Sequence, residues 1–271
     1  MLLEIRDSLG NVNTNSWTKG TGGDWPIRPS IAVSDVITFT AVGTDTNNLP
    51  LEYKFARQRP GGSFHVVQDW GSNNIYTWTV TRDDYGAQTI ISVHVRNNDG
   101  QEWQGNSLGD DYTYATYNVL TIREMITEAG GSLVAPNATG TISLLVPLGT
   151  VSQTTVFSYT EDLNSYSIPD NLSIIGHAFY LGAQQTDGTT VISFTKPMSV
   201  ELGCNPQTNV DTDTVTLFYF DDNSGEWLPV DQSPTIVGPC QFVAKTIHFT
   251  RFAFAGELRF VVYLPILLKS P

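Results

Sequence analysis

One stretch of this sequence resembles a nucleophile motif. Gly105-Asn106-Ser107-Leu108-Gly109 matches the G-x-S-x-G pattern, in which a serine is exposed on a sharp turn between a strand and a helix. Two aspartates and a strand-like segment follow it here, with no helical pattern. We therefore expect Ser107 to lie in a turn and not to act as a nucleophile.

Histidines and paired carboxylates are the candidates for metal binding. His65, His94, His177 and His248 are scattered and lack the spacing of two ligands on one helix face. The run Asp221-Asp222-Asn223-Ser224-Gly225 is similar to half of a calcium-binding loop, but the flanking helices and the closing glutamate are missing. The sequence predicts a solvated hairpin turn there, with calcium as the open alternative. We predict no catalytic residue, no cofactor and no metal.

Two further residue pairs predict covalent features. Cys204 and Cys240 lie in one apparent module of a chain with secreted composition, which predicts a disulfide; two buried free thiols are the alternative. No Cys-x-x-Cys or nearby histidine pair completes a zinc site. Asn137-Ala138-Thr139 and Asn171-Leu172-Ser173 are glycosylation sequons, so we expect Asn137 and Asn171 to lie in surface loops that could carry glycan.

Composition excludes several classes of partner. The chain has 271 residues, 40% hydrophobic and 15% charged, and a net charge of -13. Nucleic acid would require a basic stripe, which is absent, and an anionic membrane surface is disfavoured for the same reason. No apolar window reaches the ~20 residues of a membrane-spanning helix. The N-terminal residues lack the apolar region of a signal peptide, so an extracellular location requires a mature or truncated chain.

The elements that position these residues are strands. Apolar and polar residues alternate, turn residues punctuate the runs, and no helical period appears, which is typical of β-sandwiches. A Gly130-Gly131 pair marks the joint between two strand-rich blocks. Before this joint the expected strands are 2–5, 31–33, 36–42, 51–56, 64–67, 75–80, 89–96 and 114–122. A second block of strands spans 130–257. We predict an all-β fold of two tandem antiparallel β-sandwich domains, 1–126 and 127–257, followed by an extra C-terminal strand in 258–271.

Both domains show a resemblance to known modules. Residues 30–125, with Tyr76-Thr77-Trp78-Thr79-Val80 and Val93-His94-Val95-Arg96-Asn97, resemble bacterial immunoglobulin-like or fibronectin-III-like modules. Residues 130–257 resemble the ZU5-like module of bacterial surface proteins. The second resemblance rests on an opening Gly-Gly, Val146-Pro147-Leu148-Gly149, Phe194-Thr195-Lys196-Pro197 and a closing His248-Phe249-Thr250. The resemblance implies surface architecture and protein–protein contact, and it does not imply catalysis.

The segment after the second module is the most apolar run of the chain. It comprises Phe260, Val261, Val262, Tyr263, Leu264, Pro265, Ile266, Leu267 and Leu268. Both alternating faces are apolar, so a strand formed by it needs cover on two sides. The run is too short to span a bilayer. It is expected to dock either on its own chain or on the next copy, with a sorting or anchoring tag as a further alternative.

The expected function is a non-enzymatic structural or adhesive protein at the cell surface. Its partners would be other copies of itself or other surface proteins, and one candidate mechanism is self-assembly into a filament by strand addition. The rival class is a carbohydrate-binding or accessory module of a larger secreted enzyme. Exposed Trp17, Trp70 and Trp103 in a row would favour that rival, because aromatic faces stack on sugars.

Overall fold

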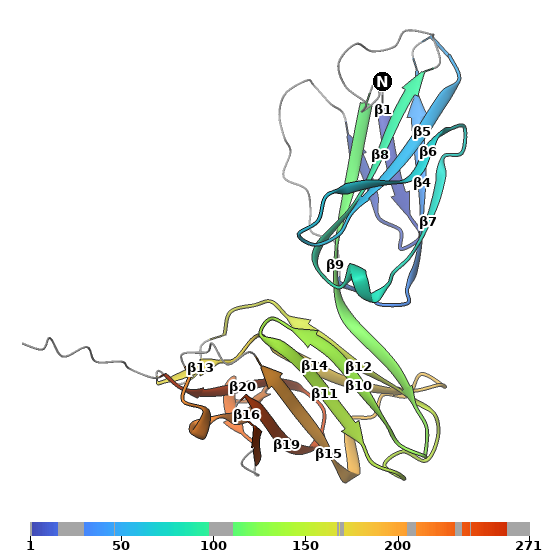
Figure 1. The fold of residues 1–271 in the computed structure, drawn as a ribbon. Helices are drawn as coiled ribbons and strands as arrows, with labels where there is room; N and C mark the ends of the chain where they lie inside the picture. The colour runs from blue at the N-terminus through green and yellow to red at the C-terminus, as the bar shows by residue number, and fades with distance from the viewer. Residues whose placement is uncertain are drawn as a thin grey trace, which may run out of the picture. The chain divides into compact units, whose positions relative to one another are not determined.

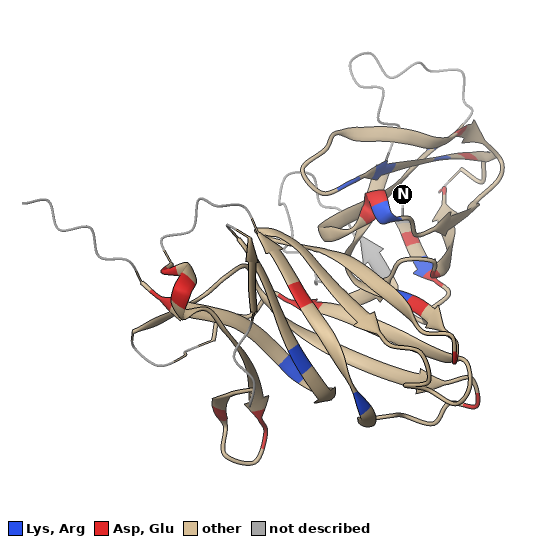
Figure 2. Ribbon diagram, turned by 60° about the horizontal axis from the view of Figure 1, so that its bottom comes forward, with Lys and Arg blue, Asp and Glu red and all other residues tan. Residues whose placement is uncertain are grey.

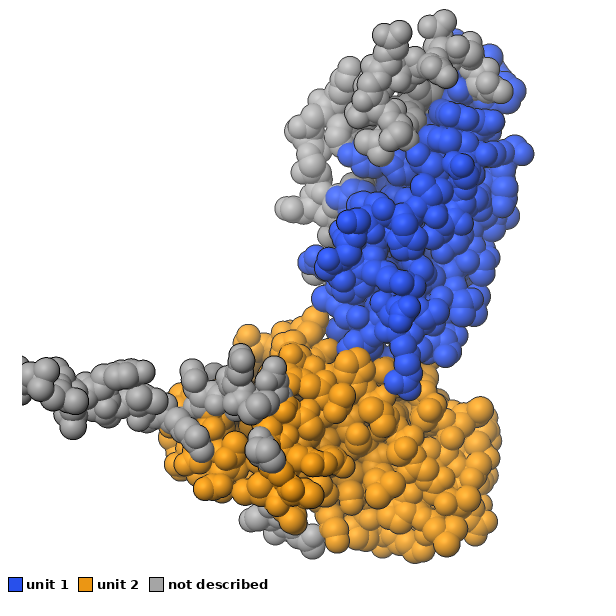
Figure 3. All heavy atoms as spheres, in the orientation of Figure 1, with its two compact units in different colours: residues 1–121 blue, residues 122–271 orange. Residues whose placement is uncertain are grey.

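The chain is all-β and divides into two compact units. The structure is a computed structural model that describes residues 2–15, 30–45, 47–97, 111–166, 168, 171–204, 210–230, 235–238 and 240–258 (Figure 1). Unit 1 is Met1–Thr121 and unit 2 is Ile122–Pro271 (Figure 3). The division falls inside one strand, β9 (Asp111–Ile126), whereas the sequence placed the domain boundary just after that strand.

Unit 1 consists of two antiparallel sheets packed face to face. One sheet has the order β2-β1-β4-β7, and the other runs β9-β8-β5-β6, with β3 pairing in parallel with β9. The remaining elements are β1 (Leu2–Asp7), β2 (Val12–Asn15), β3 (Ser30–Ala32), β4 (Val36–Thr44), β5 (Leu51–Gln58), β6 (Phe64–Gly71), β7 (Ile75–Thr79), the 3₁₀ turn η1 (Arg82–Asp84) and β8 (Gly86–Asn97).

The core of unit 1 follows from period-2 alternation. In β4, the side chains of Ile37, Phe39 and Ala41 point inward and are buried, while the residues between them are exposed or half-buried. Tyr117 and Trp78, from other strands, pack in the same core. The Tyr117 ring lies edge-on to Phe39 and to Trp78, and in each pair the ring centroids are 5.8 Å apart. Large aromatic surfaces buried between two sheets are the main stabilising contribution in such a domain.

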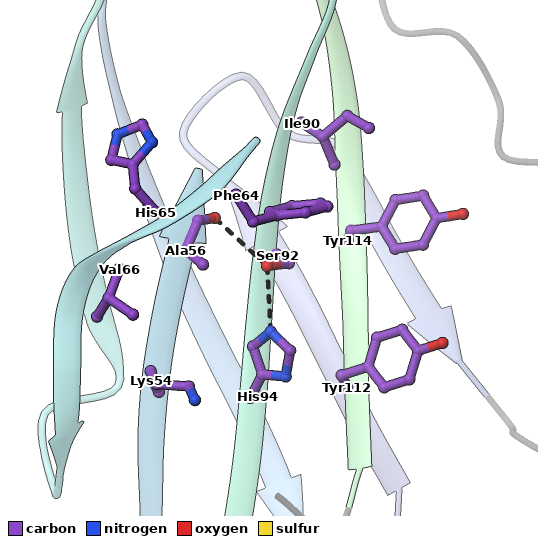
Figure 4. A pocket seen from close by; sticks show the side chains of 10 residues that line it. All are labelled: Lys54, Ala56, Phe64, His65, Val66, Ile90, Ser92, His94, Tyr112 and Tyr114. Atoms are coloured by element: carbon purple, nitrogen blue, oxygen red, sulfur yellow. Dashed lines mark hydrogen bonds between the residues drawn. The ribbon is translucent and has the colours of Figure 1, made fainter. Parts of the chain in front are cut away.

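The centres of β5 and β8 are buried on both faces. Their inward residues, such as Phe55 and Val93, join the core, but the outward residues Lys54, Ser92 and His94 are buried as well. An outward face of a two-layer sandwich normally meets water. Here β6 shifts register against β5 at two points, and extra residues of this kind bend and twist a strand. The curled strand β6 forms one wall above the outward face (Figure 4).

Unit 2 also has two antiparallel sheets. One has the order β10-β11-β15-β19-β18; the other runs β17-β16-β20-β14-β12 and continues to β9, with β13 beside β20. The elements are β10 (Gly131–Asn137), β11 (Gly140–Val146), β12 (Thr155–Asp162), β13 (Leu172–Ile174), β14 (Ala178–Gln185), β15 (Ser193–Cys204), the 3₁₀ turn η2 (Thr212–Thr214), β16 (Thr216–Asp221), β17 (Glu226–Pro229), β18 (Thr235–Gly238), β19 (Gln241–His248) and β20 (Arg251–Glu257).

The predicted Gly-Gly joint is a tight turn between β9 and β10. Gly130 has φ +79°, and its N–H donates to the carbonyl oxygen of Thr127 at 2.9 Å. A Cβ on Gly130 would come within 2.6 Å of the carbonyl oxygen of Val146, so no larger residue fits there.

The structure contains one N-terminal strand that is not among the expected ones. Residues 12–15 form β2, which pairs with β1 in a hairpin. Asp7 stabilises the connecting turn, because its carboxylate accepts hydrogen bonds from the backbone N–H groups of Leu9 and Asn11. The strand was not predicted because the Asn and Thr residues of β2 are as common in turns as in edge strands.

A candidate binding groove on the first unit

Most of the residues considered for chemistry lie apart. Gly105–Gly109 lies outside the described residues, and among the described residues no group of three or more histidines, cysteines or carboxylates could hold a metal ion. Nδ1 of His177 donates to the Glu161 carboxylate at 2.8 Å, whereas His248 lies edge-on to Tyr219. Figure 2 shows the carboxylates spread over strands and turns.

The candidate calcium loop is a hairpin turn between β16 and β17. One carboxylate oxygen of Asp221 accepts the backbone N–H of Asn223 at 3.1 Å, and the other accepts the Ser224 hydroxyl at 2.9 Å. These hydrogen bonds, led by the one from Asn223, lower the pKa of Asp221 below its ordinary value. The carboxylate therefore stabilises its own turn, as the sequence predicted for this segment.

The predicted disulfide is present. Cys204 at the end of β15 is bonded to Cys240, which immediately precedes β19, and their Cα atoms are 5.2 Å apart. The Cys204 N–H also donates to the Cys240 carbonyl oxygen at 2.9 Å. Between the two cysteines the chain leaves this sheet to form β16 and β17 in the other one. The disulfide thus joins the two ends of the segment that crosses to the other sheet of unit 2 and returns.

The two sequons have different surroundings. Asn171 is exposed, as expected. The expectation of a surface loop is wrong for Asn137, which ends β10 and is only 8% exposed. Its amide nitrogen donates to the Tyr159 hydroxyl at 3.1 Å and to the His177 carbonyl oxygen at 3.3 Å. The nitrogen that a glycan would occupy is engaged inside unit 2.

The apolar tail lies beyond the described residues, as do Trp17 and Trp103. The last described residue is Leu258, directly after β20. Its N–H donates to the carbonyl oxygen of Asn171 at 3.3 Å, so the chain is held in unit 2 up to the start of the tail. Whether the tail forms a strand stays a prediction.

A groove that the sequence did not predict lies on the outward face of the β9-β8-β5-β6 sheet. Its volume is about 530 Å³. Figure 4 shows the four strands contributing side chains to one hollow. β5 and β8 form its floor, β6 forms one wall and β9 the other. The lining residues are Lys54, Ala56, Phe64, His65, Val66, Ile90, Ser92, His94, Tyr112 and Tyr114.

The polar floor of the groove is held by internal contacts. The Ser92 hydroxyl lies 3.2 Å from Nε2 of His94 and 3.4 Å from the carbonyl oxygen of Ala56 (dashed lines in Figure 4). The His94 ring stacks on Tyr112 with centroids 5.7 Å apart. A serine nucleophile needs an exposed hydroxyl, but Ser92 is buried. The pair therefore shapes the floor.

Burial also affects the ionisable groups of the groove. Desolvation lowers the pKa of the Lys54 ammonium below its ordinary value, the nearby Asp69 opposes this change, and Arg96 reinforces it. Burial raises the pKa of the Tyr114 hydroxyl, and Tyr112 adds to the increase. The charged form of Lys54 is thus less favoured than in water, and the tyrosine stays neutral at physiological pH.

Two cations lie over Trp70 beside the groove. The Lys54 ammonium is 4.7 Å and the Arg96 guanidinium 4.4 Å from the ring centroid. Arg96 also forms an ion pair with Glu52, with Nη2 and Oε2 2.6 Å apart. These cation–π contacts occupy the ring surface that a sugar would need. Trp70 thus already contacts two cations through its ring.

The wall formed by β6 exposes apolar side chains. Phe64 and Val66 are 51% and 54% exposed, and both line the groove. β6 is the last strand in its sheet order and pairs with β5 alone among the described strands. The groove therefore lies beside a strand edge whose backbone groups can accept a further strand.

The chain carries weak sequence signals for this groove. Beside Lys54, the outward positions at the centres of β5 and β8 hold Ala56, Ser92 and His94, where a solvated face would favour more charged residues. Two tyrosines, Tyr112 and Tyr114, alternate onto the same face of β9. Period-2 analysis assigns such residues to the wet side, because it cannot foresee that β6 will curl over them.

Comparison with known proteins leaves the family open. No protein-family model and no curated protein matches this chain. The described residues contain no helix that is long and apolar enough to cross a membrane. The resemblances to immunoglobulin-like and ZU5-like modules thus stay predictions, and the function must be argued from the groove.

Proposed function

We propose that this chain is a non-enzymatic structural or adhesive protein of the cell exterior that works through protein–protein contact. The observation that carries the proposal is the groove beside the free edge of β6, with Phe64 and Val66 exposed at its rim. An open strand edge beside a groove with an apolar rim is an arrangement that binds extended polypeptide, since the edge supplies hydrogen bonds and the groove supplies side-chain contacts.

Two properties of the chain support an exterior location. The Cys204–Cys240 disulfide requires an oxidising compartment to persist. A net charge of -13 opposes non-specific association between copies, so any assembly must depend on a defined apolar contact. Both properties suit a surface protein that assembles in one specific way.

The rival carbohydrate-binding function gains no support from Trp70. Its ring contacts Lys54 and Arg96, and the groove beside it has half-buried tyrosines on one wall and Phe64 and Val66 on the other. Sugar recognition in a groove requires several convergent polar groups with free hydrogen-bonding capacity. The Ser92 hydroxyl is already engaged with Ala56 and His94.

Bead aggregation tests the proposal. Beads coated with the full chain should cluster, and a Phe64→Asp/Val66→Asp double variant should reduce clustering at least tenfold, because two charges would be desolvated at the contact. The matched control is Val36→Asp/Ile75→Asp, which alters exposed apolar residues on β4 and β7 of the same unit. Beads that never cluster would refute the function, whereas equal clustering of both double variants would place the contact outside the groove.

A further inference from the structure

β6 is the longest edge strand without proline among the described residues. It has eight residues, Phe64–Gly71, and contains no proline. The other edges are shorter or carry proline, which natural proteins use to block pairing. These are β2, β7 and β18 with four, five and four residues, β3 and β13 with three residues each, β10 with Pro136, and β17 with Pro229.

Cross-strand pairing fixes which side of β6 faces the groove. Val66 lies opposite Ala56 and Phe64 opposite Gln58, so the side chains of these pairs point to the outward face. An added strand would place its own groove-side residues next to Phe64 and Val66 and over the hollow. That strand must be apolar, because both rim residues are.

The chain itself contains a segment with these properties. Residues 260–268 form nine consecutive apolar positions, and the whole stretch 259–271 has no carboxylate. The segment starts two residues after Leu258, where the described part of unit 2 ends. Its length is close to that of β6. Both of its alternating faces are apolar, so one face can cover the groove while the other packs against protein as well.

We propose that the β6 edge of one copy accepts residues 260–268 of a second copy as an added strand, with the groove-side residues of that strand filling the hollow. This proposal rests on the proposed structural or adhesive function and names its partner. The contact is heterologous, with a donor tail and an acceptor edge on different surfaces. Each copy can therefore donate and accept, and the copies form head-to-tail chains.

Pro265 sets the phase of the added strand. Successive residues of a strand direct their N–H groups to opposite sides, and proline has no N–H to donate. Pro265 therefore faces away from β6, and so do the other odd-numbered residues of the tail. The even-numbered residues, Val262 among them, donate to β6.

This phase gives a matched pair of variants. Val262→Pro removes a hydrogen bond to β6, whereas Val261→Pro changes the neighbouring valine at a position that faces away. By sedimentation velocity over a concentration series, we expect Val262→Pro to weaken association at least tenfold and Val261→Pro to stay within about threefold of the unaltered chain. Equal effects of the two prolines would overturn strand pairing at β6.

The acceptor is tested by a charge on the rim. Val66→Lys should abolish assembly, because lysine blocks an edge, while Ile75→Lys on the edge strand β7 should not. Thermal unfolding of both variants shows whether they fold.

A complementation experiment mixes two altered chains, neither of which should assemble by itself. A chain that ends at Leu258 keeps the acceptor edge, and Val66→Lys keeps the donor tail. Mixed together, they should form a one-to-one dimer and nothing larger.

The outcomes separate this inference from the proposed function. If assembly needs the tail but not Val66, or if the mixture stays monomeric, the acceptor is not β6 and the inference fails while the function stands. A tail that docks on its own chain would leave the full chain monomeric, which also overturns the inference. Absence of both assembly and bead clustering would refute the function itself.

Discussion

Asp84 is a buried carboxylate that connects the two sheets of unit 1. Its side chain is 0% exposed. It accepts hydrogen bonds from Nη1 of Arg57 at 3.4 Å, Nε of Arg59 at 3.1 Å and Nε1 of Trp78 at 3.1 Å. The backbone N–H and hydroxyl of Thr81 donate at 3.0 and 2.9 Å. The carboxylate thus ties β5 and β7 to the turn before β8.

Asp84→Asn removes the charge and keeps the shape of the side chain. The Arg57 guanidinium, whose side chain is 12% exposed, then loses its countercharge. Removing one partner of a buried ion pair costs about 3–5 kcal/mol, because the other charge is left desolvated. We expect the free energy of unfolding of unit 1 to fall by that amount. Asp83→Asn is the matched control: its carboxylate is 74% exposed and 3.5 Å from Arg59, so its loss should cost roughly 0–1 kcal/mol.

The effect of Asp84 also depends on pH. Desolvation by itself would raise the pKa of this carboxyl group, but the hydrogen bonds from Thr81 and Trp78 and the charge of Arg57 outweigh it, so the pKa is lowered. In the unfolded chain an aspartate titrates near about 3.9. The stabilisation is therefore present above that pH and is lost as the pH falls through the lower folded pKa. The difference between the unaltered chain and Asp84→Asn should shrink in this acidic range.

Urea unfolding read by hydrogen-exchange mass spectrometry is the assay, since it reports β7 and β8 separately from unit 2. Asp84→Asn should shift the midpoint of these strands strongly at pH 7 and less strongly near pH 3. The reasoning would be refuted if Asp84→Asn and Asp83→Asn unfolded at the same urea concentration, or if the shift grew on acidification.

Three further predictions concern unit 2. Replacing Cys204 and Cys240 by serine should lower its free energy of unfolding by about 3–4 kcal/mol, and dithiothreitol should reproduce the change in the unaltered chain; no shift in the urea midpoint would contradict this. Asn137→Ala should cost about 1–3 kcal/mol, because buried partners lose hydrogen bonds, and folded protein from a secretory eukaryotic host should carry no glycan at Asn137 by mass spectrometry. Gly176→Ala should destabilise more strongly, since Gly176 has φ +76° and an added Cβ would lie 1.8 Å from Oδ1 of Asn137; an unchanged melting temperature would contradict the packing.

The all-β fold could be predicted from the sequence because its signal is local. Alternation in Ile37-Thr38-Phe39-Thr40-Ala41 places three side chains in the core and two outside, as the structure has them. The disulfide could be predicted from composition and from two cysteines in one module. Strand alternation depends on neighbouring residues and the disulfide on the compartment, and a single sequence carries signals of both.

The groove and the role of Asn137 could not be predicted because they are made by distant residues. The sequence shows Lys54, Ser92 and His94 on the polar phase of their strands, and it does not show that the curled strand β6 and the tyrosines of β9 will cover them. Asn137 matches a sequon, but its partners Tyr159 and His177 come from β12 and from the turn before β14. Local pattern does not specify such tertiary contacts.

Protection of the β6 backbone against hydrogen exchange tests the central claim most directly. We predict that those backbone amides of Phe64–Gly71 that point away from β5 become more protected in the full chain as protein concentration rises. In a chain that ends at Leu258 they should exchange fast at every concentration, while the amides of β7 should behave alike in both chains. Equal exchange of β6 in the two chains across the concentration series would contradict the account.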